Sequence, residues 1–304
     1  MISKIAIGLL ILLITIIVGA RLINTSLFRI SSPSGRVNIL VYSGNNAIVI
    51  ALDETSAHAL YFPSDTYIET AQGAGKYPIN KLSKLAELNE GGDKFIEASF
   101  ERFLAIPIDI YIGTSREISS DSISNIVKFS DIYSSKYLST NLIMPARLQL
   151  WWKLSNLRVP TENIIDVAKT RTVSTVQEAD GVEISEADVR FLPVKLQQYF
   201  VEIPLAQEQF KFMVYNTEQT PGLARLASNM LENMGTDVIL LENRSRNVKD
   251  CELHVLDEED AKTVTARRVI QAFNCELVID SSGSGKLVAS IYLGESFSKL
   301  MFGR

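Results

Sequence analysis

The chain has few of the residues that build metal centres and covalent catalytic sites. Its 304 residues include only two histidines, His58 and His254, and two cysteines, Cys251 and Cys275. These four residues match none of the spacings of Cys/His zinc clusters, so we expect no structural zinc site. His58 has no serine or cysteine partner in a recognisable motif, which argues against a nucleophilic triad. We interpret His58 as a structural or solvent-facing histidine.

The chain also lacks any block of positive charge. The 30 lysines and arginines are scattered and outnumbered by 35 acidic residues, which gives a net charge of -5. Because nucleic-acid binding requires a dense basic face, we expect no nucleic-acid partner. The hydrophobic content of 46% is ample for packing, and the length suits two modest domains.

One long apolar run is present, at the N-terminus. Residues 5–20 carry no charge, and with the next three residues the run approaches the roughly 20 residues that span a bilayer. We predict a transmembrane signal-anchor over residues 1–23, embedded in the lipid bilayer through residues 5–23, and a linker over 24–35. A cleaved signal peptide and a buried core helix are the alternatives. The anchor implies a single-pass protein of the cytoplasmic membrane with most of the chain outside the cytoplasm.

The first half of the remaining chain predicts a mixed α/β domain over residues 36–205. β-branched and aromatic runs separated by turn residues predict strands at 37–42, 47–52 and 57–62. Helical spacing follows over 80–90 and 93–104, and a strand over 106–111. A helix is expected over 145–157, and another begins at 185–188. Trp151-Trp152 in the first of these helices is expected in the core, with stacking on a sugar ring as the alternative.

The C-terminal part predicts a compact α+β sandwich over residues 206–304, in which two helices cover one face of a sheet. Strands are expected at 211–215, 238–241, 252–256 and 287–293. A helix after Pro221-Gly222 shows apolar spacing up to Gly235, and a second helix is expected over 257–273.

Residues 61–68 read Tyr-Phe-Pro-Ser-Asp-Thr-Tyr-Ile. They resemble the Pro-Arg-Asp-Thr-Tyr-Val strand end of the LytR-CpsA-Psr (LCP) family, envelope phosphotransferases that move polyprenyl-pyrophosphate-linked glycopolymers onto peptidoglycan. Residues 46–50, 78–80, 91–92 and 106–109 resemble further motifs of that family in the same order. The resemblance implies an LCP-like domain with a mixed sheet flanked by helices.

The C-terminal part resembles the LytR C-terminal domain that often follows the catalytic domain in this family. The matching residues are 214–216, 221–224 and 293–297, which correspond to its Val-x-Asn, Gly-Leu-Ala and Leu-Gly-x-x-Phe motifs. This resemblance implies an envelope interaction module without established catalytic residues.

The departures from the family pattern remove charge. The motif arginine is Ser64, a conserved aspartate that helps to hold Mg²⁺ is Asn46, and a lysine is Pro78. The family's segment with paired arginines is missing. A serine hydroxyl cannot replace the charged, bidentate fork of arginine, and a neutral amide is a poorer Mg²⁺ ligand than a carboxylate. The sequence therefore predicts that the family's reaction is lost.

The resemblance assigns the remaining site residues. Asp65 would be a base that activates a sugar hydroxyl and Asn80 would position phosphate oxygens, with Asn46, Ser64 and Thr66 lining the ligand site. The alternative is structural, because short polar side chains also cap strand ends by bonding to their own backbone. We favour the structural role.

Three functional hypotheses follow. The first is a membrane-anchored LCP-like protein that binds glycopolymer, peptidoglycan or envelope partners without catalysis and needs no cofactor. The second is an active phosphotransferase on polyprenyl-linked glycopolymer, which would require Mg²⁺. The third is an envelope subunit in which only the C-terminal domain matters.

The two cysteines predict a disulfide. Both lie in the part expected outside the cytoplasm, where an even number of cysteines favours a bridge. Cys251 precedes a predicted strand and Cys275 follows the next helix, so the bridge would join that helix to the sheet. Two buried free thiols are the alternative.

Overall fold

The computed structural model describes residues 32–53, 56–89, 91–116, 118, 138–156, 163–170, 173–177, 183–187, 199–280 and 285–303. The predicted membrane anchor and most of the predicted linker lie outside these ranges. No helix within them combines the length and apolar character needed to cross a bilayer. The anchor over residues 5–23 therefore stays a prediction.

The first sheet is mixed and six-stranded, in the order β7-β6-β1-β2-β3-β8. β1, β2 and β3 run antiparallel, whereas β6 is parallel to β1 and β8 is parallel to β3. The three strands predicted between residues 37 and 62 are confirmed. The strands are β1 (Val37–Tyr42), β2 (Ala47–Leu52), β3 (Ala57–Phe62), β6 (Ile110–Thr114), β7 (Leu138–Thr140) and β8 (Ile164–Asp166).

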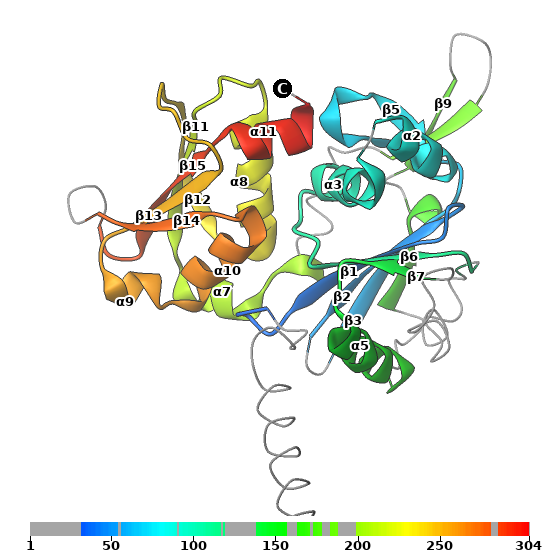
Figure 1. Cartoon of the computed structure of the whole chain (residues 1–304), viewed down its shortest axis with the longest axis horizontal. Helices are drawn as coiled ribbons and strands as arrows, with labels where there is room; N and C mark the ends of the chain where they lie inside the picture. Colours follow the sequence, from blue (N-terminus) through cyan, green and yellow to red (C-terminus); the bar gives the residue numbers. More distant parts are fainter. Residues whose placement is uncertain are drawn as a thin grey trace, which may run out of the picture.

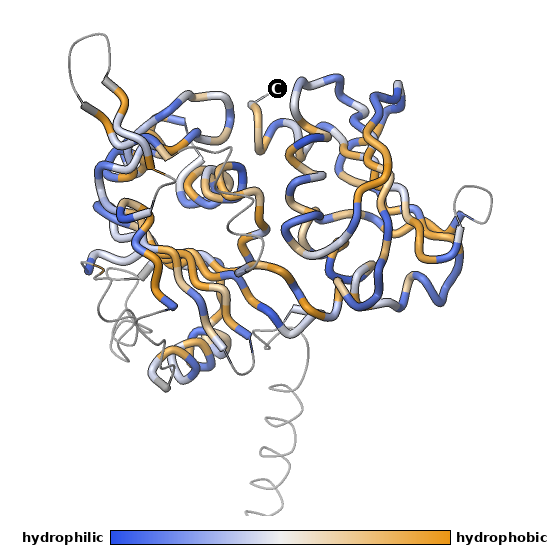
Figure 2. The backbone as a smooth tube through the Cα atoms, turned by 180° about the vertical axis from the view of Figure 1, so that it is seen from behind, coloured by the Kyte–Doolittle hydropathy of each residue, from blue (hydrophilic) through white to orange (hydrophobic). Residues whose placement is uncertain are grey.

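Helices cover both faces of this sheet (Figure 1). α2 (Leu82–Leu88) and α3 (Gly92–Leu104) pack on one face, and α5 (Met144–Asn156) packs on the other. Successive side chains of a strand point to opposite faces, so Leu40 joins the α3 side and Ile39 the α5 side. Burial on both faces explains why β1 and β2 are apolar along almost their whole length, as Figure 2 shows.

A second sheet of four short strands has the order β5-β4-β10-β9. The helix start predicted at residues 185–188 is wrong for its described part, because Ser185 to Ala187 belong to β10. β10 pairs with β9 and with β4, which is distant in sequence, so tertiary pairing outweighs the local preference. The strands are β4 (Thr66–Glu69), β5 (Lys76–Pro78), β9 (Val173–Gln177) and β10 (Glu183–Ala187).

Two further expectations for this half need correction. The strand expected from Ile106 begins at Ile110, because Pro107 has no N–H to donate and the Asp109 carboxylate accepts the Asn38 N–H. Trp152 is 64% exposed, so its expected burial is wrong.

The third sheet lies wholly after residue 206 and has the order β12-β11-β15-β13-β14. All four strands predicted for this part are present, whereas β14 and the helices α7 and α11 were not predicted. The elements are β11 (Lys211–Asn216), β12 (Asp237–Asn243), β13 (Cys251–Val255), β14 (Glu276–Ile279), β15 (Val288–Leu293), α7 (Ile203–Glu208), α8 (Leu223–Met234), α9 (Glu258–Ala261), α10 (Val264–Phe273) and α11 (Glu295–Phe302). The domain limits themselves stay a prediction.

The helix expected over 257–273 is two helices. Asp257 caps α9 by accepting the N–H groups of Glu259 and Asp260, and the Thr263 hydroxyl caps α10 by accepting the N–H of Ala266. Two N-caps six residues apart define two separate starts, so the chain turns between them.

The two halves share one hydrophobic cluster, which contains Phe100 and Phe103 of α3 together with Met230 of α8 and Met301 of α11. α11 lies against α3 and the short 3₁₀ helix η2 (Ala71–Gly73) (Figure 1). Arg102 donates to the Met301 carbonyl at 2.8 Å. A Cβ at Gly303 would lie 2.5 Å from the Gln72 carbonyl oxygen, so only glycine allows this close approach.

The structure joins Cys251 to Cys275 in a disulfide at the starts of the neighbouring strands β13 and β14. The bridge encloses α9 and α10, and its half-cystines are buried. It therefore ties both helices to the edge of the third sheet.

Reduction of this bridge is expected to lower the free energy of unfolding by about 3.5 kcal/mol, because a closed loop of this length restricts the unfolded chain. Urea unfolding of the full chain with and without reductant measures the change. The Cys251→Ala/Cys275→Ala variant should show no further loss on adding reductant. Equal thiol labelling of the unfolded protein with and without reductant would show that the cysteines are free.

Candidate functional site

The residues predicted for the ligand site meet at one end of the strands of the first sheet, beside the start of β2 and the end of β3. Asn46 directly precedes β2, Ser64 and Asp65 form the turn after β3, and Thr66 begins β4. Ala47 pairs with Phe62, which places Asn46 beside the start of this turn. The Asn80 N–H donates to the Ser64 carbonyl at 3.1 Å. The structure thus brings all five residues into one region.

The side chain of Asn46 is hydrogen-bonded to neighbouring protein groups. Its Oδ1 accepts the Ser43 hydroxyl at 2.5 Å, and its Nδ2 donates to the Tyr61 hydroxyl at 3.0 Å and to the Ile118 carbonyl at 2.9 Å. Only 6% of the residue is exposed. The amide therefore holds the β1–β2 turn to the end of β3. Both of its N–H donors are used, so none is left for a phosphate, and its oxygen already accepts one hydrogen bond in a largely buried position.

Two other site residues carry unsatisfied polar atoms. Thr66 Oγ1 and Asn80 Oδ1 are buried without a hydrogen-bond partner in the part of the chain that the structure describes. A buried oxygen without a partner costs free energy, so both atoms would gain from a water molecule or a ligand group that donates to them. Both groups are neutral.

Asp65 is the charged residue among the five residues of the predicted site. Its side chain is exposed, and no described residue bonds it, so the capping role favoured for Asp65 from the sequence is wrong. Pro78 ends β5 without charge, and Lys76 two residues earlier pairs with Glu186 instead. The described residues therefore leave a hydroxyl, an amide and one uncompensated carboxylate at the site. This set can hydrogen-bond sugar hydroxyls but would repel a pyrophosphate.

The same residues do not fit the Mg²⁺ that the family resemblance implies. A hard divalent cation needs several oxygen ligands, preferably carboxylates. The Asn46 oxygen is occupied, and among the described residues no cluster of three metal-ligating side chains lies here or elsewhere.

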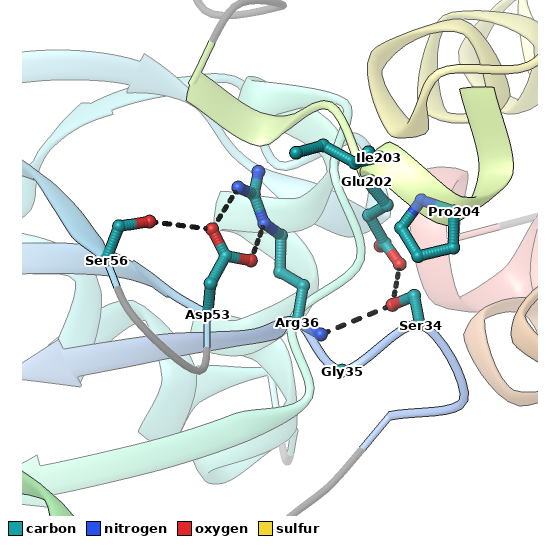
Figure 3. A pocket seen from close by; sticks show the side chains of 8 residues that line it. All are labelled: Ser34, Gly35, Arg36, Asp53, Ser56, Glu202, Ile203 and Pro204. Atoms are coloured by element: carbon teal, nitrogen blue, oxygen red, sulfur yellow. Dashed lines mark hydrogen bonds and ion pairs between the residues drawn. The ribbon is translucent and has the colours of Figure 1, made fainter. Parts of the chain in front are cut away.

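A pocket of about 390 Å³ lies at the opposite end of these strands, beside the start of β1 and the β2–β3 turn (Figure 3). It is formed by residues 34–36, by Asp53 and Ser56 at the β2–β3 turn, and by residues 202–204 at the start of α7. No sequence motif marks this pocket, because its residues come from three separate segments of the chain.

The charged groups that line the pocket are already paired. Arg36 Nε and Nη2 donate to both carboxylate oxygens of Asp53 at 2.7 and 2.6 Å, and Nη1 donates to the Tyr199 carbonyl at 2.8 Å. Burial would raise the pKa of Asp53, but Arg36 and the Ser56 hydroxyl lower it below its ordinary value. The pocket therefore presents an ion pair rather than a free charge.

Behind the pocket lies a buried network centred on Arg268 of α10, which has no exposed surface. Its guanidinium binds Asp109 at 2.6 and 3.1 Å and Glu202 at 2.9 and 3.1 Å. Glu202 also accepts the hydroxyl of Ser34, and Asp109 accepts the Asn38 N–H at 2.8 Å. The network joins the predicted linker, the first sheet and the C-terminal part.

Two glutamates of α3 extend this network. Burial raises the pKa of Glu101 to about 8, with added repulsion from Glu97 and Asp109, although the Ile108 N–H bond and Arg268 oppose the shift. Burial also raises the pKa of Glu97 to about 7, with added repulsion from Asp109 and Asp93 against the attraction of Lys94. Both carboxyls therefore hold protons at a pH where exposed glutamates are ionised.

Known proteins show a partial likeness of fold. No family model and no curated protein matches the chain. Similar solved structures include B. subtilis TagT at 13% identity and B. subtilis TagU at 12%. They cover 56% and 54% of this chain, and 93% and 95% of their own, with TM-scores of 0.37 and 0.34. A transcriptional regulator from Enterococcus faecalis is similar at 10% identity over 68% of this chain and 91% of its own, with a TM-score of 0.39.

TagT and TagU are LCP proteins, of the family that the motifs resemble. With TM-scores below 0.5, this likeness carries no conclusion about the family of this chain. Neither an activity nor a substrate follows from similarity at this level.

Replacing Arg268 by methionine is expected to lower the free energy of unfolding by about 3–5 kcal/mol, because Asp109 and Glu202 would remain buried without their partner. Urea unfolding measures the loss. The matched control is Arg267→Met on the same helix, whose exposed side chain should change stability by no more than about 0.5 kcal/mol. Adding Asp109→Asn and Glu202→Gln to Arg268→Met should recover part of the loss. Equal effects of the two single arginine variants would contradict the central role of Arg268.

Stability is expected to fall as pH rises from about 5 to 8. The folded pKa of Glu101, about 8, lies above the ordinary value of 4.5, so the folded state binds more protons in this window. The contribution is complete below pH 4.5 and is lost as pH rises through 8. Thermal unfolding across this range measures it. Glu101→Gln should flatten the profile, whereas Glu87→Gln on the exposed side of α2 should not. Parallel profiles for all three proteins would refute the shift.

Proposed function

We propose that the chain is a membrane-anchored protein of the cell envelope that binds glycopolymer or peptidoglycan outside the cytoplasm without transferring it. The apolar run of residues 5–23 supports a single-pass anchor in the cytoplasmic membrane. The motifs over residues 46–109 support an LCP-like domain, and those after residue 206 support a LytR C-terminal domain as an interaction module. The site residues supply the reason for binding without transfer.

The exposed carboxylate of Asp65, which no described cation neutralises, carries this proposal. A carboxylate accepts hydrogen bonds from two sugar hydroxyls, and the Ser64 hydroxyl and Asn80 amide beside it add donors. The same carboxylate repels a pyrophosphate, which in active relatives meets an arginine at the position of Ser64. The proposed ligand is therefore the sugar portion of an envelope polymer rather than its pyrophosphate end.

The proposal requires no cofactor. Transfer from a polyprenyl-pyrophosphate donor would depend on Mg²⁺. The Asn46 amide, whose oxygen already accepts the Ser43 hydroxyl, is a poor ligand for that ion. Retained phosphotransferase activity is the alternative function, and the same assay tests it.

The full chain in detergent or nanodiscs is expected to bind soluble peptidoglycan or glycopolymer fragments and to give no glycan transfer from a polyprenyl-pyrophosphate donor with Mg²⁺. Asp65→Asn should weaken fragment binding roughly 10- to 100-fold, as expected for loss of hydrogen bonds to a charged group. Calorimetry measures the binding, and release of polyprenyl phosphate measures the transfer.

Asp237→Asn is the matched control, because Asp237 is also exposed but lies in the third sheet. It should bind as the unchanged protein does. Glycan transfer that Asp65→Asn abolishes would establish the phosphotransferase instead. Equal binding by the unchanged protein and Asp65→Asn would remove Asp65 from the site.

A further inference from the structure

The outer side of α5 carries an apolar stripe in contact with solvent. Single exposed apolar residues are ordinary on protein surfaces, but these recur along one side of one helix and its first preceding turn. They are Ile143, Met144, Leu148 and Trp152, which are 51%, 41%, 38% and 64% exposed.

The stripe is not the side of α5 that packs on the sheet. Ala146, Leu150 and Leu154 are buried against β1, β2 and β6. The exposed residues precede them by two positions, which is about 200° around a helix axis. The helix is therefore apolar on two nearly opposite sides, and packing on the sheet accounts for only one of them.

The charge of this segment differs from that of the whole chain. Residues 132–161 contain four basic residues and no acidic residue, although the chain has a net charge of -5. Arg147 and Lys153 lie in α5 itself. Tryptophan together with lysine and arginine beside an apolar surface is typical of helices at a membrane interface.

The position of α5 is compatible with a bilayer nearby. α5 and the first described residues, 32–36, both lie toward the lower side of the molecule in Figures 1 and 2. Residues 24–32 span at most about 30 Å when extended, so the anchor would keep this side close to the membrane.

We propose that the exposed stripe of α5 docks on the anionic surface of the bilayer that holds the chain. Leu148 and Trp152 enter the headgroup region, and Arg147 at the border of the stripe pairs with lipid phosphates. A second copy of the chain is a poorer occupant, because the basic residues of this segment would lie against their own copies. This inference rests on the membrane anchor of the proposed function. It goes further by fixing which side of the first sheet faces the lipid.

Tryptophan fluorescence tests the docking directly, because Trp151 and Trp152 are the only two tryptophans of the chain. The full chain is reconstituted in vesicles with brominated acyl chains, of phosphatidylcholine alone or mixed with phosphatidylglycerol. In Trp151→Phe, the remaining Trp152 should lose much of its fluorescence in the mixed vesicles, and high salt should restore it. In Trp152→Phe, the half-buried Trp151 should be quenched far less.

Arg147→Gln/Lys153→Gln is expected to weaken the docking on the order of tenfold or more, since each cation near an anionic surface contributes to attraction. Lys81→Gln/Lys84→Gln is the matched control, because these exposed lysines lie at α2 on the other face of the sheet and should leave quenching unchanged.

Alkaline carbonate separates the two possible failures. Extraction of the chain by carbonate would overturn the anchor, on which the docking rests. Retention of the chain without quenching of Trp152 would overturn the docking alone. A concentration-dependent blue shift of Trp152 without lipid quenching would assign the stripe to a second copy and would equally overturn it.

Discussion

The arrangement of the two halves depends on one buried arginine. Arg268 is the point at which the C-terminal part meets both Asp109 of the first half and Glu202 of the connection between the halves. A charged group without exposed surface is stable only with complete pairing, and an alternative packing of α10 would leave it unpaired. Apolar contact alone permits small sliding movements, whereas four directional bonds do not. The shared hydrophobic cluster therefore holds the two halves together, and Arg268 fixes their position relative to each other.

The same network extends toward the predicted membrane linker. Ser34 donates to Glu202, and Arg36 two residues later fixes the β2–β3 turn through Asp53. The first described segment of the chain is thus bonded to the first half and to the connection between the halves before β1 begins.

Local sequence signals predicted the elements whose burial follows from their own composition. The apolar runs of β1 and β2 and the spacing of α3 and α8 are such cases. The signals failed where partners distant in sequence decide the outcome, as for β10, which pairs with β4. The sequence shows only that Arg268 lies on the apolar side of a predicted helix. It does not indicate the two carboxylate partners, which are distant in sequence. At the candidate site the motif brought five residues together correctly, whereas the bonding of Asn46 required the fold.

The two buried arginines of the described residues, Arg36 and Arg268, do not supply the positive charge that the candidate site lacks. Three nitrogens of the Arg36 guanidinium already donate, as do three nitrogens of Arg268. Arg36 precedes β1 and Asp65 follows β3. The two therefore lie at opposite ends of the strands, whose six residues span about 20 Å. If either arginine moved toward Asp65, its carboxylate partner would be left without a counter-charge, and the fold would be destabilised. Both buried arginines are thus held in structural pairs, and neither supplies positive charge to the polar groups beside Asp65.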